Sequence, residues 1–174
     1  MPDYALLAHQ IKELAEVDAH WLPVLANTSA LLWDALEDIN WAGFYLVDRV
    51  LSGEKRDSPE EQCIPVLRLG PFQGKVACVR IPFGQGVCGT AAATGESQLV
   101  ENVHEFSGHI ACDAASNAEV VVPLRVGGTI VGVLDIDSPV PGRFSREDLL
   151  GLETVARRIE QVARFFSASG LPSV

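Results

Sequence analysis

The sequence predicts an α+β domain in which helices cover an antiparallel sheet. Three observations support this class. Apolar residues recur at helical spacing within residues 3–39. About six strand-like segments follow, mostly with hairpin connections and with one helix between them. A last amphipathic pattern over residues 145–167 closes the chain.

The helices are indicated by spacing and by their end signals. Apolar positions from Tyr4 to Leu14 predict a first amphipathic helix, and those from Leu25 to Ile39 predict a second. The small residues from Val87 to Thr94, set between glycines, predict a short helix packed closely on its neighbours. Ser145 and Asp148 stand at the spacing of a capping box, which marks the start of the closing helix.

The strands are indicated by runs of β-branched and aromatic residues between turn signals. The clearest candidates are Trp41 to Val47, Cys63 to Leu69, Lys75 to Ile81, Val120 to Val126 and Thr129 to Ile136. The segment from Gly70 to Gly74 predicts a hairpin turn between the second and third. Gly127-Gly128 is the strongest hairpin signal and makes the last two strands central.

Length and composition describe an ordinary globular protein. The chain has 174 residues, of which 48% are hydrophobic and 21% charged. A chain of this length folds without a disulfide or a structural metal. Because no linker or repeat divides the sequence, we expect residues 1–174 to form one domain, with the sheet and the functional site within 41–137.

Charge and hydropathy exclude two classes of partner. The formal net charge of −10 disfavours nucleic acid and anionic membranes, because each contact would oppose the protein's own field. No apolar run reaches the roughly 18 residues of a spanning helix, and no secretory signal is seen, so we expect a cytoplasmic protein. Thiols stay reduced there, so the four cysteines are expected to be catalytic, metal-binding or inert rather than a permanent framework.

Among the cysteines, Cys112 is the candidate nucleophile. It lies in a long polar segment near His104, His109 and Ser116, where a thiol can meet a small molecule and a positive charge can activate it. From its position in mid-strand, Cys78 is expected to be a small buried hydrophobe.

A zinc site is the alternative use of these thiols, since Cys and His are the usual ligands and His104 or His109 could complete a set. Structural zinc sites usually contain closely spaced pairs such as C-x-x-C, and the sequence has none. The spacing therefore argues against a metal, and none is expected. Zinc bound through Cys112 would overturn the enzyme hypothesis.

Three carboxylates converge at one end of the last two strands. Asp135 and Asp137 point to the same face, and Glu119 begins the paired strand. In a strict two-residue hairpin Glu119 would lie opposite Ile136 and face away, so a shared site needs a three-residue loop or a bulge. Clustered carboxylates would supply an acid and also anions for an ammonium group, which suits an amino acid. The Trp41 side chain could form one side of a pocket for a methyl or thioether group.

Five segments together resemble the free methionine-(R)-sulfoxide reductases, which are enzymes built on a GAF domain. They are Asn40 to Tyr45, Gly70 to Cys78, Gly86 to Ala91, Gly108 to Ser116 and Gly132 to Ser138, and the resemblance covers about residues 30–165. It implies a six-stranded antiparallel sheet with helices on both faces, often in a homodimer, and reduction of one epimer of free methionine sulfoxide.

The resemblance also implies roles for single residues. Cys112 corresponds to the catalytic cysteine, Cys78 to the resolving cysteine and Cys88 to a third cysteine that joins disulfide exchange. The substrate-binding residues would be Trp41, Glu119, Asp135 and Asp137. We expect Asp137 to serve the sulfoxide oxygen, with Glu119 and Asp135 binding the ammonium group. Cys63 lies outside the pattern and is treated as structural. No cofactor is implied, only an external dithiol such as thioredoxin.

The alternative function is that of a stand-alone GAF sensor that binds a small ligand without turning it over. It would use the same fold and the same pocket, since the Gly132 to Asp137 pattern alone indicates only a GAF domain. A pure sensor has no need of Cys112 with two further cysteines in reach, so the cysteines favour the enzyme.

Overall fold

The computed structural model describes residues 2–48, 65–106 and 115–165. In chain order the elements are α1 (Tyr4–Val17), α2 (Trp21–Ala35), β1 (Trp41–Val47), β2 (Val66–Gly74), β3 (Arg80–Pro82), α4 (Gly86–Thr94), β4 (Gln98–Val100), the 3₁₀ turn η1 (Val103–Glu105), β5 (Ala118–Val126), β6 (Thr129–Ser138) and α5 (Arg146–Val162). Within these ranges no helix combines the length and the apolar character needed to cross a membrane.

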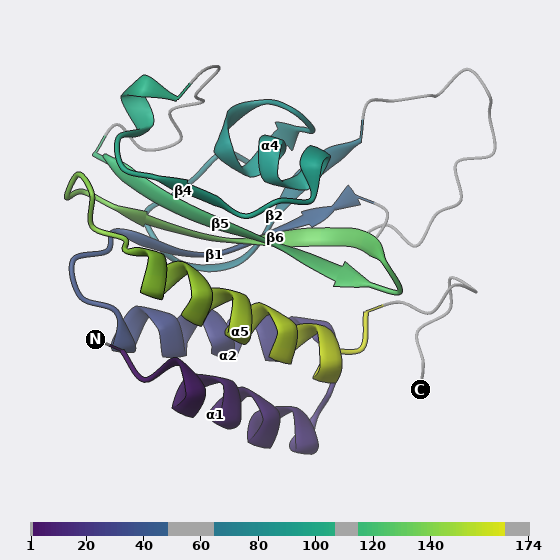
Figure 1. Ribbon diagram of the computed structural model, residues 1–174. Helices are drawn as coiled ribbons and strands as arrows, with labels where there is room; N and C mark the ends of the chain where they lie inside the picture. Colours follow the sequence, from purple (N-terminus) through teal and green to yellow (C-terminus); the bar gives the residue numbers. More distant parts are fainter. Residues whose placement is uncertain (1, 49–64, 107–114, 166–174) are drawn as a thin grey trace, which may run out of the picture.

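The six strands form one antiparallel sheet in the order β3-β2-β1-β6-β5-β4. Helices α2 and α5 pack on one face, α1 packs on these two helices, and α4 covers the opposite face (Figure 1). The fold class expected from the sequence is therefore confirmed, with helices on both faces. The side chains of β1, β5 and β6 are buried almost throughout, so the core lies on the two sides of these central strands.

Several residues that the sequence predicts to form turns or helix ends have these roles in the structure. Gly127 and Gly128 adopt φ values of 57° and 79°, which a tight two-residue turn between β5 and β6 requires. Gly95 ends α4 in the left-handed conformation with φ 71°. Ser145 and Asp148 form the predicted capping box at the start of α5.

The predicted hairpin turn from Gly70 to Gly74 is wrong, because these residues belong to β2 and pair with β1. A bulge at this place takes up Pro71, which has no N–H to give to a regular ladder. The predicted strand from Lys75 to Ile81 is reduced to β3, which pairs with β2 as expected. Cys78 therefore lies in the β2–β3 connection and not in a strand.

Two helices are shorter than the sequence patterns suggest. Helix α2 stops at Ala35, so Ile39 lies beyond it, because Asp38 takes a left-handed φ of 57° as the chain turns toward β1. Helix α5 stops at Val162. Arg164 then donates its backbone N–H to the carbonyl of Ala19 at 2.6 Å, which requires a non-helical backbone.

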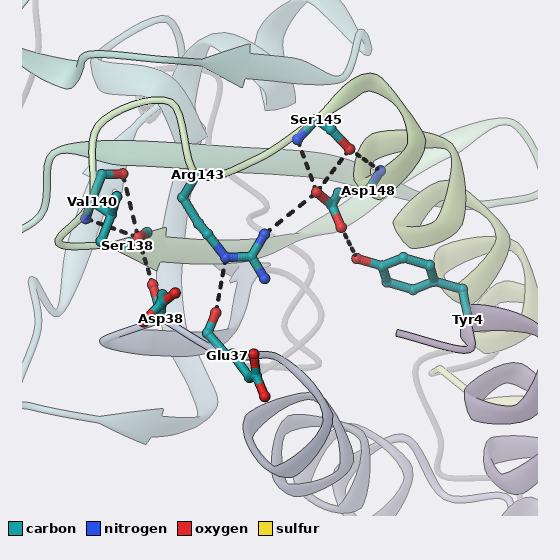
Figure 2. A network of polar contacts seen from close by, with 8 residues as sticks. All are labelled: Tyr4, Glu37, Asp38, Ser138, Val140, Arg143, Ser145 and Asp148. Atoms are coloured by element: carbon teal, nitrogen blue, oxygen red, sulfur yellow. Dashed lines mark hydrogen bonds and ion pairs between the residues drawn. The ribbon is translucent and has the colours of Figure 1, made fainter. Parts of the chain in front are cut away.

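A buried polar network joins the first and last helices (Figure 2). The Tyr4 hydroxyl donates to the Asp148 carboxylate at 2.6 Å, and that carboxylate also accepts from the backbone and hydroxyl of Ser145. Arg143 lies 3.5 Å from Asp148 and donates to the carbonyl of Glu37 at 2.9 Å. The network holds α1 and the end of α2 against the start of α5.

Candidate active site

The candidate site lies on the face of the sheet that α4 covers. Trp41 pairs with Asp137 across β1 and β6, and Glu119 pairs with Asp137 across β5 and β6. Residues that are directly opposite each other in antiparallel strands project from the same face. Asp135, two positions before Asp137, projects there as well. The convergence of carboxylates expected from the sequence is therefore present.

A bulge in β6 produces this convergence. Arg125 pairs with Ile130, whereas Leu124 pairs with Gly132, so Val131 is an extra residue in the strand. The turn itself keeps two residues, and the added one moves Glu119 from the position opposite Ile136 to the position opposite Asp137. Of the two solutions open from the sequence, a longer loop or a bulge, the protein uses the bulge.

Helix α4 places a cysteine thiol on the carboxylates. The Cys88 sulfur lies 3.7 Å from Oε1 of Glu119, and one ligand atom each from Cys88, Glu119 and Asp135 lies within 4.8 Å of the other two. Gly89 lets the helix come this close, because a Cβ there would lie 2.3 Å from the carbonyl oxygen of Pro82. We call these three residues the thiol–carboxylate cluster.

Burial and mutual repulsion control the charge of the cluster. All three side chains are buried, and burial raises the pKa of Asp135 to about 7. Burial, followed by the charges of Asp135 and Asp137, raises the pKa of Glu119 well above its usual value. Burial and the neighbouring carboxylates also raise the pKa of the Cys88 thiol. Burial and repulsion therefore shift all three groups toward their neutral forms.

An aromatic wall borders the cluster. The Trp41 ring stacks on Phe72 at 5.2 Å and on Tyr45 at 5.7 Å between ring centroids. The indole Nε1 of Trp41 is buried without a hydrogen-bond partner among the described residues. Gly43 permits the stack, because a Cβ there would lie 2.3 Å from Cβ of Phe72.

Sequence reasoning missed Tyr45 as a site residue. Burial and then the charges of Asp135 and its neighbours raise the pKa of the Tyr45 hydroxyl, so the side chain faces the cluster. The alternation along β1 carried the signal, since Tyr45 is four positions from Trp41 and shares its face.

The remaining predicted residues are only partly within the described ranges. Cys112, Cys63 and His109 lie outside them. Cys78 is half-buried and is bonded in a disulfide, whereas Cys88 is a free thiol. His104 is exposed on η1, and its Nε2 lies 3.1 Å from the Asn117 side-chain oxygen, away from the cluster.

Comparison with known proteins places the chain in a family. Residues 8–162 match the model of the GAF domain. The chain is 52% identical over 159 residues to the free methionine-R-sulfoxide reductase of Escherichia coli, covering 91% of this chain and 87% of that protein. It is 43% identical over 157 residues to the enzyme of the same name from Saccharomyces cerevisiae, covering 87% and 81%.

A solved structure agrees. The fRMsr of Staphylococcus aureus in complex with substrate is 44% identical, with a TM-score of 0.80, and the match covers 94% of this chain and 97% of that one. The protein is thus a GAF-domain protein in fold and in sequence, and it belongs to the family of free methionine-R-sulfoxide reductases.

Proposed function

We propose that the protein reduces free L-methionine-(R)-sulfoxide to L-methionine, with electrons from an external dithiol such as thioredoxin. The observation that carries the proposal is the thiol–carboxylate cluster beside the wall of Trp41, Tyr45 and Phe72, in a chain 52% identical to a reductase of that name. The aromatic wall suits the methyl end of the substrate, and the carboxylates suit its ammonium group.

The buried carboxylates support an acid in this reaction. A thiolate attacks the sulfoxide sulfur once the oxygen is protonated or strongly hydrogen-bonded. A group with a pKa near 7, such as Asp135, can donate that proton at neutral pH. Glu119 is also held toward its neutral form, whereas Asp137 is only half-buried and keeps more hydration for its charge. This favours Glu119 or Asp135 for the oxygen and Asp137 for the ammonium, the reverse of the preference drawn from the sequence.

Cys112 is the proposed nucleophile, on the resemblance of its segment to the family motif. Its thiolate forms a bond to the sulfur of the protonated sulfoxide. The hydroxyl group then passes from the substrate sulfur to the Cys112 sulfur as the bond between the two sulfurs breaks, so methionine leaves and Cys112 becomes a sulfenic acid. A second thiol attacks the sulfenic sulfur and releases water as a disulfide forms. An external dithiol then reduces that disulfide, so two electrons enter for each sulfoxide consumed.

Cys78 is the proposed resolving thiol. It is bonded in a disulfide in a chain whose Cys88 remains free, which supports a role in exchange. Cys88 is buried, and its contact with Glu119 supports a place within the substrate pocket. A thiol whose pKa burial raises is a poor attacking group, so Cys88 would enter exchange only after a change in its surroundings.

Selectivity for the free amino acid follows from the same pocket. A free amino acid carries an α-ammonium group that an acidic pocket can bind. A peptide-bound residue lacks this charge and carries chain on both sides, which a closed pocket excludes.

The test is NADPH oxidation coupled through thioredoxin and its reductase, with free L-methionine-(R)-sulfoxide, its S epimer and a peptide-bound form in parallel. Turnover of the free R epimer alone, lost in Cys112→Ser and kept in Cys63→Ser, is the expected result. Binding of the R epimer without turnover, seen as a higher melting temperature, would support the sensor instead.

A further inference from the structure

We propose that Cys88, Glu119 and Asp135 also form a binding site for a thiophilic divalent cation, represented by Zn²⁺ or Cd²⁺, which competes with the sulfoxide. The competition rests on the proposed function, whereas binding of the ion does not. The bound ion would be a reversible inhibitor and not a cofactor.

The spacing of the ligand atoms fits such an ion. In a tetrahedral zinc site, with Zn–S near 2.3 Å and Zn–O near 2.0 Å, sulfur and oxygen ligands lie about 3.5 Å apart. The Cys88 sulfur and Oε1 of Glu119 are 3.7 Å apart, and an oxygen of Asp135 completes a group within 4.8 Å. Small side-chain movements would therefore bring all three onto one ion.

An unpartnered oxygen points independently to a ligand at this place. Asp135 is 4% exposed, and its Oδ1 is buried without a hydrogen-bond partner among the described residues. A buried carboxylate oxygen without a partner is costly. A cation coordinated there would satisfy it, and the same ion would separate the charges of Glu119 and Asp135.

Among the described residues, no cationic side chain is found next to the cluster to compete with the ion. Within the described ranges, every neighbour whose charge or hydrogen bond shifts the pKa values of Cys88, Glu119 and Asp135 is itself a carboxylate or the thiol. Binding would release the thiol proton, and any proton held by the two carboxyl groups, to solvent. Affinity should therefore rise with pH.

The ligand types select the class of ion. A thiolate favours Zn²⁺ and Cd²⁺ over Mg²⁺ and Ca²⁺, which need six or more oxygen ligands. Three protein ligands leave the fourth position to water, which is the arrangement of exchangeable zinc sites. The spacing of cysteines along the sequence could not indicate this site, since its ligands come from α4, β5 and β6.

The competition follows from the shared groups. A cation bound to Glu119 and Asp135 removes the proton that the sulfoxide oxygen needs, and it occupies the space beside Trp41. Substrate and ion should therefore exclude each other.

The experiment isolates Cys88 from the other thiols. In a variant with Cys63→Ser, Cys78→Ser and Cys112→Ser, CdCl₂ is added and the ultraviolet charge-transfer band of a cadmium–thiolate bond is followed by titration. We expect one Cd²⁺ per chain, displaced by ZnCl₂ and by EDTA. Adding Cys88→Ser should abolish the band, and Glu119→Gln should weaken binding at least about tenfold, since loss of even an outer-shell partner costs 10–100-fold. Glu147→Gln, which removes an exposed carboxylate of α5, is the matched control and should change nothing.

If the triple variant does not fold, the oxidised wild-type protein is compared with its own Cys88→Ser variant. Cys78 is then in its disulfide and Cys88 is free, so the Cys88 band is the difference between the two proteins, whatever the remaining thiol contributes to both. Absence of the band in a folded protein, or a band unchanged by Cys88→Ser, overturns the ion site. Free L-methionine-(R)-sulfoxide should displace the ion. If the band persists at saturating sulfoxide, the ion site is supported, but the proposed competition between ion and sulfoxide is overturned. Failure of turnover with an intact cadmium band would instead count against the proposed function alone.

Discussion

The hydroxyl of Tyr4 donates a 2.6 Å hydrogen bond to the carboxylate of Asp148, which lies 144 residues further along the chain. Burial alone would raise the pKa of Asp148, but hydrogen bonds from Tyr4 and Ser145 and the charge of Arg143 outweigh it, and the pKa is lowered. The first helix is therefore bound to a carboxylate that also caps the last one.

Removing this hydrogen bond should weaken the helical layer without affecting the site. Tyr4→Phe keeps the ring and deletes one donor to a buried carboxylate, which costs about 1–3 kcal/mol of unfolding free energy. Urea unfolding measures the loss. In a double-mutant cycle with Asp148→Asn the effects should be less than additive, and strict additivity would contradict the coupling.

Gly151 of α5 lies against the same tyrosine, because a Cβ there would be 2.1 Å from the Tyr4 ring. Gly151→Ala should therefore lower stability by about 1–3 kcal/mol through overpacking, against a gain of up to about 1 kcal/mol in helix propensity. Urea unfolding again measures the change. Thr154→Ala, on the exposed side of the helix, is the control. A combined Tyr4→Leu substitution should recover part of the loss, and no recovery would argue against the ring contact.

Replacing Asp135 should abolish activity and increase the stability of the fold. Its pKa of about 7 in the folded protein lies above the usual value near 3.9. The ionised form therefore destabilises the fold: the penalty is full above pH 7 and is relieved progressively as the pH falls from about 7 toward about 3.9. Asp135→Asn should abolish turnover and raise the melting temperature by a few degrees at pH 9, since 1 kcal/mol corresponds to about 2–4 °C here.

The gain in melting temperature should shrink between pH 9 and pH 5, where wild-type Asp135 becomes protonated. Asp34→Asn, an exposed position in α2, is the matched control and should change the melting temperature little. A lower melting temperature for Asp135→Asn at pH 9 would contradict the buried-charge account.

The indole of Trp41 should matter more for substrate than for stability. Trp41→Phe keeps a ring for stacking on Phe72 and Tyr45, and it removes a buried N–H that has no partner among the described residues. We expect KM for the free sulfoxide to rise about tenfold, because the substitution removes one hydrogen bond to a charged or polar group of the ligand. The unfolding free energy should change by less than about 1.5 kcal/mol. Trp33→Phe, at an exposed indole, is the control, and equal effects at both positions would contradict this role.

Local signals predicted the elements that local chemistry controls. The Gly127-Gly128 turn, the Ser145 capping box and the Gly95 helix end depend on a few neighbouring residues, and all are confirmed. The segment from Gly70 to Gly74 has the composition of a turn but forms a strand, because pairing with β1 overrides local preference.

The candidate site likewise contains features that local sequence signals predict and features that depend on tertiary packing. Alternation placed Asp135 and Asp137 on one face, and Glu119 joined them only through a bulge. No sequence signal predicted the contact between Cys88 and Glu119, because it depends on how closely α4 approaches the sheet across Gly89. The roles of Cys112 and Cys63 remain predictions, since both lie outside the described residues.

Because of the extra residue at Val131, the site depends on whether the number of strand residues between the turn and each carboxylate is odd or even. Odd and even positions of a strand face opposite sides, so a gain or loss of one residue between the turn and Glu119 would direct its carboxylate to the helical core, although every site residue was retained. A change of two residues would leave the facing intact. In related chains, therefore, an intact set of site residues indicates a working pocket only when the number of residues between them is also preserved.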